Sequence, residues 1–443
     1  MGLMLPGRTG TKLEAAYSGR DNAFNFMRLC FALMVIVFHA GVIGWGLGHE
    51  PIAWPVDLGG IAVTGFFGLS GFLICRSGRR TSPVRFVWHR ILRIFPGYWA
   101  CLIATAFILA PLLFWHEHGS LHLFRHTGSG PLGYVYHNFL TDQQQGDVSR
   151  VTYTAKYPSV LNGSLWTLKS ELTCYLLVLL LAIIAVLRRA RWLVLVIGGG
   201  LLAVIVWDTF VGPTQPGPLA PVIVVDLPVL GVFLLFYLAV FGLAFVLGMI
   251  ADLYRAVIPM NDVLGVIATV CWLASLWLGW PLFGPAVVAF VYMLLWLGVR
   301  IPRALRRIGR KNDYSYGVYI YAFPLQQALS ILGVPRFGYW FYLLTSIVTV
   351  LAVAMASWHL VEKRAMRLKD WSPPLGSLRG RREVPNPDVP PAAHPAPILV
   401  PAQASEPQDA RVPSPRSPSS PADAHLVPTP RAAETDALEP HDQ

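Results

Sequence analysis

Long apolar runs recur along the chain, each about as long as a helix that crosses a bilayer. Such a helix needs about 20 predominantly apolar residues. By that criterion the sequence predicts an all-α fold, a polytopic membrane bundle of about ten transmembrane helices. The expected spans lie near residues 24–44, 59–75, 94–115, 165–187, 191–210, 229–250, 262–280, 282–299, 314–332 and 339–361.

The basic residues between these runs alternate in a way that predicts the orientation of the bundle. Loops that face the cytoplasm carry an excess of Lys and Arg. The segments 76–93 and 300–311 are arginine-rich, whereas the short loops around Trp54, Pro216 and Trp280 contain no Lys or Arg. This alternation supports the helix count and predicts that both the N- and C-termini are cytoplasmic.

Three regions follow from the change in polarity along the chain. Residues 1–23 form a polar cytoplasmic segment without a small-residue cleavage site, so the first span is expected to stay as an anchor. Residues 24–362 form the transmembrane domain. Residues 363–443 are basic and then rich in Pro, Ala and Ser without apolar periodicity, which predicts a disordered cytoplasmic tail.

The composition excludes several classes of function. The chain is 54% hydrophobic and 13% charged, whereas a soluble domain carries about 25% charged residues. The net charge of +11 lies in arginine clusters between spans and not on a basic face with interleaved aromatics, so nucleic-acid binding is rejected. The five cysteines form no C-x-x-C pair, and neither a disulfide framework nor a zinc site is readable.

One predicted outer loop, residues 116–163, is long and polar and contains five histidines. The irregular spacing of these histidines favours a solvated loop over a metal site, so no metal is predicted. A loop of this length often acts as a lid or a binding loop.

Ionisable residues inside membrane spans are expensive and indicate function by default. Arg28 and His39 share one face of the first span, about 16 Å apart along its axis. Lys169 and Glu171 lie in the fourth span, and Glu171 is expected about 10 Å below the outer surface, at a depth similar to that of His39. A neutral imidazole is a suitable general base, and a carboxylate can orient it. The alternative for His39 is a hydrogen-bonded interior histidine.

Two further segments each have a structural and a functional interpretation. Arg90 and Arg93 share a helix face at the cytoplasmic end of the third span, where they either fix the topology or bind an anion such as phosphate. The small-residue stretch Gly65–Phe72, which includes Ser70, allows either close helix packing or backbone approach to a slender ligand.

Taken together, these segments resemble the membrane acyltransferase 3 family over roughly residues 20–370. No single motif is specific, but six occur in the order of the family. They are F-N-F-M-R-L-C-F-A-L-M-V-I-V-F-H-A (24–40), G-F-F-G-L-S-G-F-L-I (65–74), H-R-I-L-R-I-F-P (89–96), N-G-S-L-W-T-L-K-S-E-L-T-C-Y (162–175), Y-S-Y-G-V-Y-I-Y-A-F-P-L-Q-Q (314–327) and S-W-H-L-V-E-K (357–363).

The resemblance implies acyl transfer at the cytoplasmic (inner) membrane of a bacterium. The donor would be acyl-CoA, usually acetyl-CoA, acting as a co-substrate with no tightly bound cofactor. The acceptor would be a hydroxyl of a polysaccharide, lipid-linked sugar or other glycoside. His39 would match the catalytic histidine and Glu171 the glutamate of the S-L-W motif. Arg90 and Arg93 would match the arginines that hold the phosphates of the donor.

Other motif residues extend the two expected binding sites. Arg28 and Ser70 would join the donor site, because they belong to the first two motifs. Trp166, Tyr175 and Asn162, all in the fourth motif, would line the acceptor site.

The chain also departs from the family pattern. Asn25 stands where an Asp is common, Arg364 stands where a Pro is frequent, and Tyr321-Ala322 stand where many members carry a His. The last difference argues against a role for a second histidine.

The mechanism that follows is direct transfer, in which His39 removes the hydroxyl proton and Glu171 supports the imidazolium. An acyl-enzyme relay stays open, although no free Ser or Cys nucleophile is evident. A membrane transporter or flippase for a sugar or lipid is the alternative from another class, but no internal repeat is visible. A sensor or scaffold that acts through its tail is a third possibility.

Overall fold

A computed structural model describes residues 11–19, 21–52, 57–124, 129–210, 224–227, 231–278 and 284–371. The chain divides into one compact unit, Met1–Leu375, and a second unit from Gly376 onward. The predicted disordered tail falls almost entirely outside the described residues. The last described helical turns reach Asp370, beyond the domain boundary predicted at residue 362.

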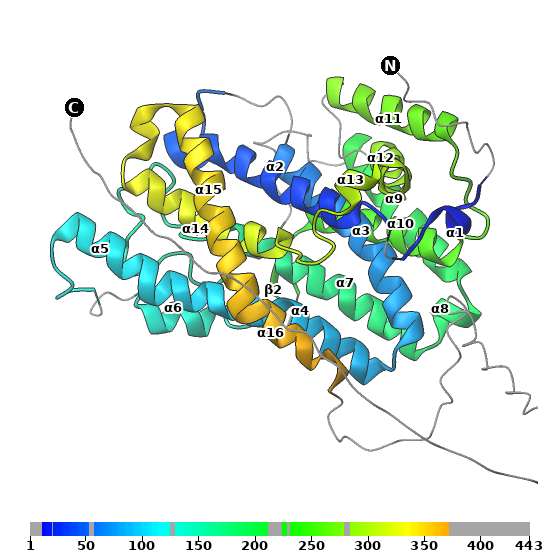
Figure 1. The fold of residues 1–443 in the computed structure, drawn as a ribbon, viewed down its shortest axis with the longest axis horizontal. Coiled ribbons are helices and arrows are strands. Elements are labelled where there is room, and N and C mark those ends of the chain that lie inside the picture. The colour runs from blue at the N-terminus through cyan, green and yellow to red at the C-terminus, as the bar shows by residue number, and fades with distance from the viewer. Residues whose placement is uncertain are drawn as a thin grey trace, which may run out of the picture. The chain divides into compact units, whose positions relative to one another are not determined.

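The first unit is a bundle of apolar helices (Figure 1), which confirms the predicted class of fold. Six helical stretches in the described part are long and apolar enough to cross a membrane. They are α2 (Phe24–Trp45), α3 (Leu58–Arg80), the stretch Pro83–His118, the stretch Gly163–Ile183, α10 (Leu235–Leu253) and the stretch Tyr339–Asp370.

Two of these stretches contain a turn of wider π-helix. The first joins α4 (Pro83–Ala104) through Thr105–Leu109 to α5 (Ala110–His118), and the second joins α15 (Tyr339–Ser357) through Trp358–Glu362 to α16 (Lys363–Met366). Such turns occur frequently at functional sites.

The remaining helices are shorter. Three of them, α9 (Trp192–Phe210), α11 (Asp262–Trp277) and α12 (Gly284–Arg300), are apolar but do not meet the length criterion over their described residues. The predicted count of about ten spans is therefore not confirmed and stays a prediction. The other helices are α1 (Leu13–Ala16), α6 (Pro131–His137), α8 (Val186–Arg189), α13 (Arg303–Arg306) and α14 (Ser315–Ile331). Helix α7 (Trp166–Ile183) follows the turn Gly163–Leu165 within the long stretch Gly163–Ile183.

One short hairpin interrupts the helical fold. Strands β1 (Val224–Leu227) and β2 (Gly231–Leu234) pair antiparallel just before α10. The apolar pattern of the sequence predicted a helix from about residue 229 and did not predict this hairpin.

Helix α3 lies at the centre of the bundle and packs against α2, α7, α10 and α12. Its first turn is fixed by Asp57, whose side chain accepts a hydrogen bond from the amide of Gly60 at 2.7 Å. This is the usual way to satisfy a free amide at a helix N-terminus. The other carboxylate oxygen of Asp57 accepts from the hydroxyl of Tyr237 at 3.0 Å, so the same side chain also joins the start of α3 to α10.

Glycines allow α3 and α10 to approach until their backbones touch. A Cβ atom added at Gly71 would lie 1.9 Å from the carbonyl oxygen of Phe245, and one at Gly248 would lie 2.2 Å from that of Gly68. Small residues permit such contacts between membrane helices. The packing interpretation of the glycine-rich stretch therefore holds for Gly71.

We predict that Gly71→Ala destabilises the bundle, because the added methyl group cannot be accommodated against a backbone carbonyl. Overpacking of this kind costs about 1–3 kcal/mol, so the thermal unfolding midpoint of the purified protein in detergent should fall. Gly199→Ala is the matched control, since no atom lies within 4 Å of a Cβ at that position. Equal midpoints for the two variants would contradict the close α3–α10 contact.

Candidate active site

Six helices, α2, α3, α4, α7, α14 and α16, line a cavity of about 230 Å³, which we call the arginine cavity. All four residues predicted to bind the donor line it. They are Arg28 of α2, Ser70 of α3, and Arg90 and Arg93 of α4. The other lining residues are Leu73, Ile74, Ile94, Glu171, Tyr175, Tyr316 and Met366.

The three arginines of this cavity differ in how their charges are compensated. Arg93 donates to Asp313 with 2.5 Å between Nη2 and Oδ2. Within the described residues, Arg28 and Arg90 take part in no ion pair, and their Nε atoms are buried without a hydrogen-bond partner. Arg28 faces the ring of Phe66 instead. Two of the three guanidiniums therefore face the arginine cavity without an ion-pair partner among the described residues.

Asp313 precedes α14 and lies outside the predicted spans. Burial works to raise the pKa of its carboxyl, but the guanidiniums of Arg93 and Arg28 outweigh that effect and hold the pKa below its ordinary value. Asp313 therefore stays ionised near neutral pH and serves as the counter-charge of Arg93.

Glu171 is the carboxylate of the arginine cavity itself. The hydroxyl of Tyr175 donates a hydrogen bond to it from one turn further along α7. Tyr175 also faces the guanidinium of Arg90, 5.7 Å from the ring centroid. Glu171 and Tyr175 therefore belong to one polar cluster with Arg90.

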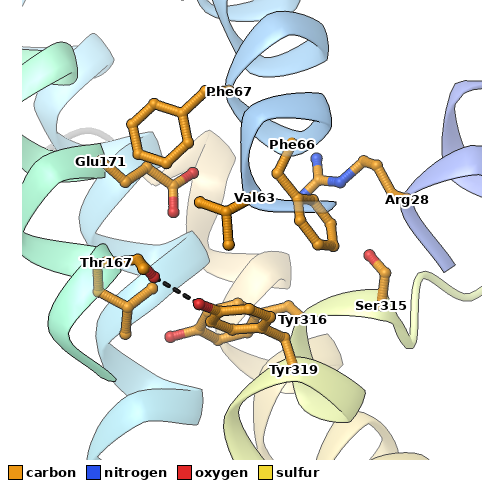
Figure 2. A pocket seen from close by; sticks show the side chains of 10 residues that line it. Arg28, Val63, Phe66, Phe67, Thr167, Glu171, Ser315, Tyr316 and Tyr319 are labelled. Atoms are coloured by element: carbon orange, nitrogen blue, oxygen red, sulfur yellow. Dashed lines mark hydrogen bonds between the residues drawn. The ribbon is translucent and has the colours of Figure 1, made fainter. Parts of the chain in front are cut away.

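A second, smaller cavity of about 30 Å³ adjoins the first, and we call it the tyrosine cavity. Figure 2 shows its walls: Arg28 from α2, the α3 side chains of Val63, Phe66 and Phe67, and α7 and α14 on the other side. The side chains of Thr167 and Tyr319 meet across it in a hydrogen bond of 2.5 Å. Both cavities share Arg28, Glu171 and Tyr316 as lining residues.

The α7 segment and α14 run antiparallel, and their contacts define levels through the bundle. Glu171 lines the tyrosine cavity with Tyr316, and Thr167 meets Tyr319 one turn further on. One more turn along, a Cβ atom at Gly163 would touch the ring of Phe323 at 2.6 Å.

The structure places His39 at the level of Phe323, and the centroids of the two rings lie 5.0 Å apart. The predicted similar depth of His39 and Glu171 is therefore wrong: Glu171 lies about 12 Å away along the helix axis, at the level of Arg28. The Nδ1 atom of His39 is buried without a hydrogen-bond partner, so His39 is not the hydrogen-bonded interior histidine of the alternative interpretation either.

The three residues expected at the acceptor site are dispersed. Tyr175 lines the arginine cavity. Trp166 packs on the rings of Tyr237 and Phe241. Asn162 is fully buried, and its side chain donates to the carbonyl of Ile320 at 3.0 Å while it accepts from the amide of Ser164. Asn162 therefore joins the turn Gly163–Leu165 to α14.

Several polar residues around the arginine cavity were not predicted from the sequence. Tyr316 lines both cavities. Glu362 lies nearby, 2% exposed, and its carboxylate accepts from Ser357 at 3.1 Å. Both residues stand in quoted motifs, so an ionisable or aromatic side chain within a motif was the available signal. Asp313 precedes such a motif and carried no comparable signal.

We predict that Asp313→Asn lowers stability by about 2–4 kcal/mol, because it leaves the buried Arg93 cation without a counter-charge. The thermal midpoint in detergent at neutral pH measures the effect. The contribution of Asp313 is present at neutral pH and is lost as the pH falls through its lowered pKa, so the difference between variant and parent should shrink in acid.

Asp370→Asn is the control for this prediction. Asp370 pairs with Arg85 at 3.5 Å, but its side chain is 72% exposed, so its loss should have almost no effect. A midpoint for Asp313→Asn equal to that of Asp370→Asn would show that the Arg93–Asp313 pair does not stabilise the bundle.

Comparison with known proteins gives the arrangement a family. The sequence matches the acyltransferase 3 family, described as an acyltransferase domain, over residues 21–359. It is 30% identical over 360 residues to an O-acetyl transferase of Shigella phage Sf6, covering 78% of this chain and 96% of that protein. It is 29% identical over 385 residues to nodulation protein 10 of Rhizobium leguminosarum bv. viciae, covering 80% and 95%.

No solved structure matches the chain. The family match covers most of the membrane bundle and includes α2, α3, α4, α7 and α14, which supply every lining residue of both cavities except Met366. The chain is therefore a member of the acyltransferase 3 family of membrane acyltransferases.

Proposed function

We propose that the protein transfers an acyl group, in the first place acetyl, from acyl-CoA to a hydroxyl of an envelope polysaccharide, lipid-linked glycan or other glycoside. The observation that carries this proposal is the arginine cavity, in which Arg28 and Arg90 face open space without an ion pair among the described residues. A buried cation without a partner is costly, so the cavity favours an anionic ligand. The name of the phage relative supports acetyl as the group.

The donor binds by its phosphates in this proposal. Guanidinium groups bind phosphate oxygens through two parallel hydrogen bonds, and Arg28 and Arg90 have donor atoms free for this. The hydroxyl of Ser70, which also lines the arginine cavity, adds a further donor. The carboxylates of Glu171 and Asp313 partly balance the three positive charges when no donor is bound. Glu171 therefore positions the arginines in this proposal and is not the partner of His39.

The reactive end of the donor then extends through the tyrosine cavity. The residues of α14 give the order of these sites along the bundle. Tyr316 lines the arginine cavity, Tyr319 lines the tyrosine cavity, and Phe323 contacts His39. The tyrosine cavity therefore lies between the phosphate site and His39. Its 30 Å³ hold about one water molecule, so the Thr167–Tyr319 contact must open before a pantetheine arm can pass.

His39 is the general base in this proposal. Its imidazole takes the proton of the acceptor hydroxyl, the oxygen attacks the thioester carbonyl, and the C–S bond breaks. The proton then passes to the departing thiolate, which gives an ester and CoA-SH. Burial against Phe38 and Phe323 favours the neutral imidazole that this step requires.

The acceptor approaches from the side opposite to the arginines. Tyr157, in the segment 116–163, packs on Phe323 with 5.9 Å between ring centroids, and Phe323 is the ring that contacts His39. In this proposal the acceptor therefore binds near Tyr157, and not at Asn162 or Tyr175. In this proposal the arginine cavity faces the cytoplasm, where acyl-CoA is available. The membrane is then the bacterial inner membrane, and both chain termini lie on its cytoplasmic side.

We predict that Arg90→Ala raises the KM for acetyl-CoA about 10–100-fold, because charge-assisted hydrogen bonds contribute about 1.5–3 kcal/mol each. Membranes that contain the protein would be given labelled acetyl-CoA and an envelope glycan fraction, and the label in glycan would be counted. The KM for glycan should stay unchanged. Arg189→Ala is the control, since Arg189 is exposed and does not line the cavity. An unaltered KM for acetyl-CoA would refute the phosphate site.

We predict that His39→Gln lowers kcat at least about 100-fold, as expected for loss of a general base, while the protein still accumulates in the membrane. The same label transfer measures it, and accumulation is followed by immunoblot. His49→Ala is the matched control, because His49 is exposed near the end of the same helix. Transfer by His39→Gln at the parental rate would remove His39 from the mechanism.

A further inference from the structure

The short helix α6 (Pro131–His137) lies against a membrane-spanning helix rather than beyond its end. The carbonyl of Asn138, just after α6, accepts a hydrogen bond from the hydroxyl of Tyr98. The carbonyl of Phe139 accepts one from the indole of Trp99 at 3.1 Å, and the two rings stack with 4.8 Å between centroids. α6 also packs on the π-helical turn Thr105–Leu109.

The sequence of the spanning helix fixes the depth of these contacts. From residue 94 to residue 115 it contains no Asp, Glu, Lys or Arg, and a helix of that length spans about 33 Å, close to the hydrocarbon thickness of about 30 Å. Trp99 lies about 8 Å inside this stretch and Thr105 lies near its middle. α6 is therefore at the depth of the lipid chains.

The exposed surface of α6 and of the turn that follows it is mainly apolar. Leu132, Tyr136 and Leu140 recur every four residues and are 75%, 80% and 70% exposed, and His137 at the end of α6 is an exposed polar side chain beside them. The buried face of the same helix carries Tyr134. The adjoining spanning helix also exposes apolar side chains between residues 103 and 115, so the face of α6 continues the lipid-facing surface of that span. The exposed residues of the span are Ile103, Phe107, Ile108, Leu112 and Trp115.

The backbone around α6 is hydrogen-bonded as a segment inside a membrane must be. The side-chain amide of Gln145 donates to the carbonyls of Ser129, at 3.1 Å, and Asp147, at 2.7 Å. The side chain of Asn138 donates to the carbonyl of Gln145 and accepts from its amide. Water would satisfy these groups in an exposed loop, whereas irregular backbone at membrane depth requires protein partners.

We propose that α6 is a re-entrant element of the membrane domain whose face of Leu132, Tyr136 and Leu140 contacts the acyl chains of the bilayer. The sequence predicted that the segment 116–163 is a solvated outer loop. In this proposal only part of the segment is solvated. It turns back into the bilayer at α6. This inference concerns the membrane surface of the protein and does not rest on the proposed reaction.

Site-directed spin labelling of the full-length protein in phospholipid nanodiscs tests the proposal. Cys30 and Cys271, the exposed cysteines, would be replaced by Ser, and single cysteines would be introduced as Leu132→Cys, Tyr136→Cys or Leu140→Cys. Leu112→Cys serves as the lipid-facing reference. Arg189→Cys, exposed in a cluster of arginines between two helices, serves as the water-facing reference. Accessibility of each label to molecular oxygen and to a water-soluble nickel chelate is then measured.

The expected oxygen-to-nickel accessibility ratio on α6 is similar to that at position 112 and about tenfold above that at position 189, because oxygen concentrates in hydrocarbon and the chelate does not enter it. Three positions are labelled so that failure of one variant to fold, seen by size-exclusion chromatography, leaves the other two. Nickel accessibility on α6 as high as at position 189 would overturn the proposal and place α6 in water.

Discussion

The organisation of this site depends on positive charge held inside a low-dielectric bundle. Arg28, Arg90 and Arg93 converge on one cavity from two helices, and Asp313 forms an ion pair with Arg93 alone. Each guanidinium keeps its charge at any physiological pH, so the bundle cannot relieve the excess by losing a proton. The remaining ways are hydration, the nearby carboxylate of Glu171, or an anionic ligand. A donor that carries phosphate groups satisfies this constraint, and a neutral sugar does not.

The sequence predicted the helical membrane fold well because hydrophobic length is a local property of the chain. It also predicted that Arg28, Ser70, Arg90 and Arg93 belong together, and they do line one cavity. That success came from family motifs rather than from periodicity, since nothing in the spacing between α2 and α4 requires them to face each other. The hairpin β1–β2 had no such signal and was missed.

The depth of Glu171 could not be read from the sequence for a physical reason. The predicted depth was counted from a membrane surface placed at Ser164. The helix, however, begins with the turn Gly163–Leu165, which already lies inside the bundle beside Phe323. An error in the position of the surface shifts every residue of the helix by the same amount. Likewise, Glu362 reaches its place because a π-helical turn (Trp358–Glu362) changes the register at that point, and Gly97 and Gly317 leave room for its side chain.

The two walls of the tyrosine cavity differ in how easily they can move. On one side α3 is fixed, because its backbone touches that of α10 at Gly71 and Gly248 and a displacement would open a void in a close-packed contact. On the other side the Thr167–Tyr319 hydrogen bond can be exchanged for one to a ligand at small net cost. In the proposed reaction, passage of the donor from the arginine cavity to His39 would therefore require movement between α7 and α14, while α3 stays in place and keeps Ser70 beside the arginines.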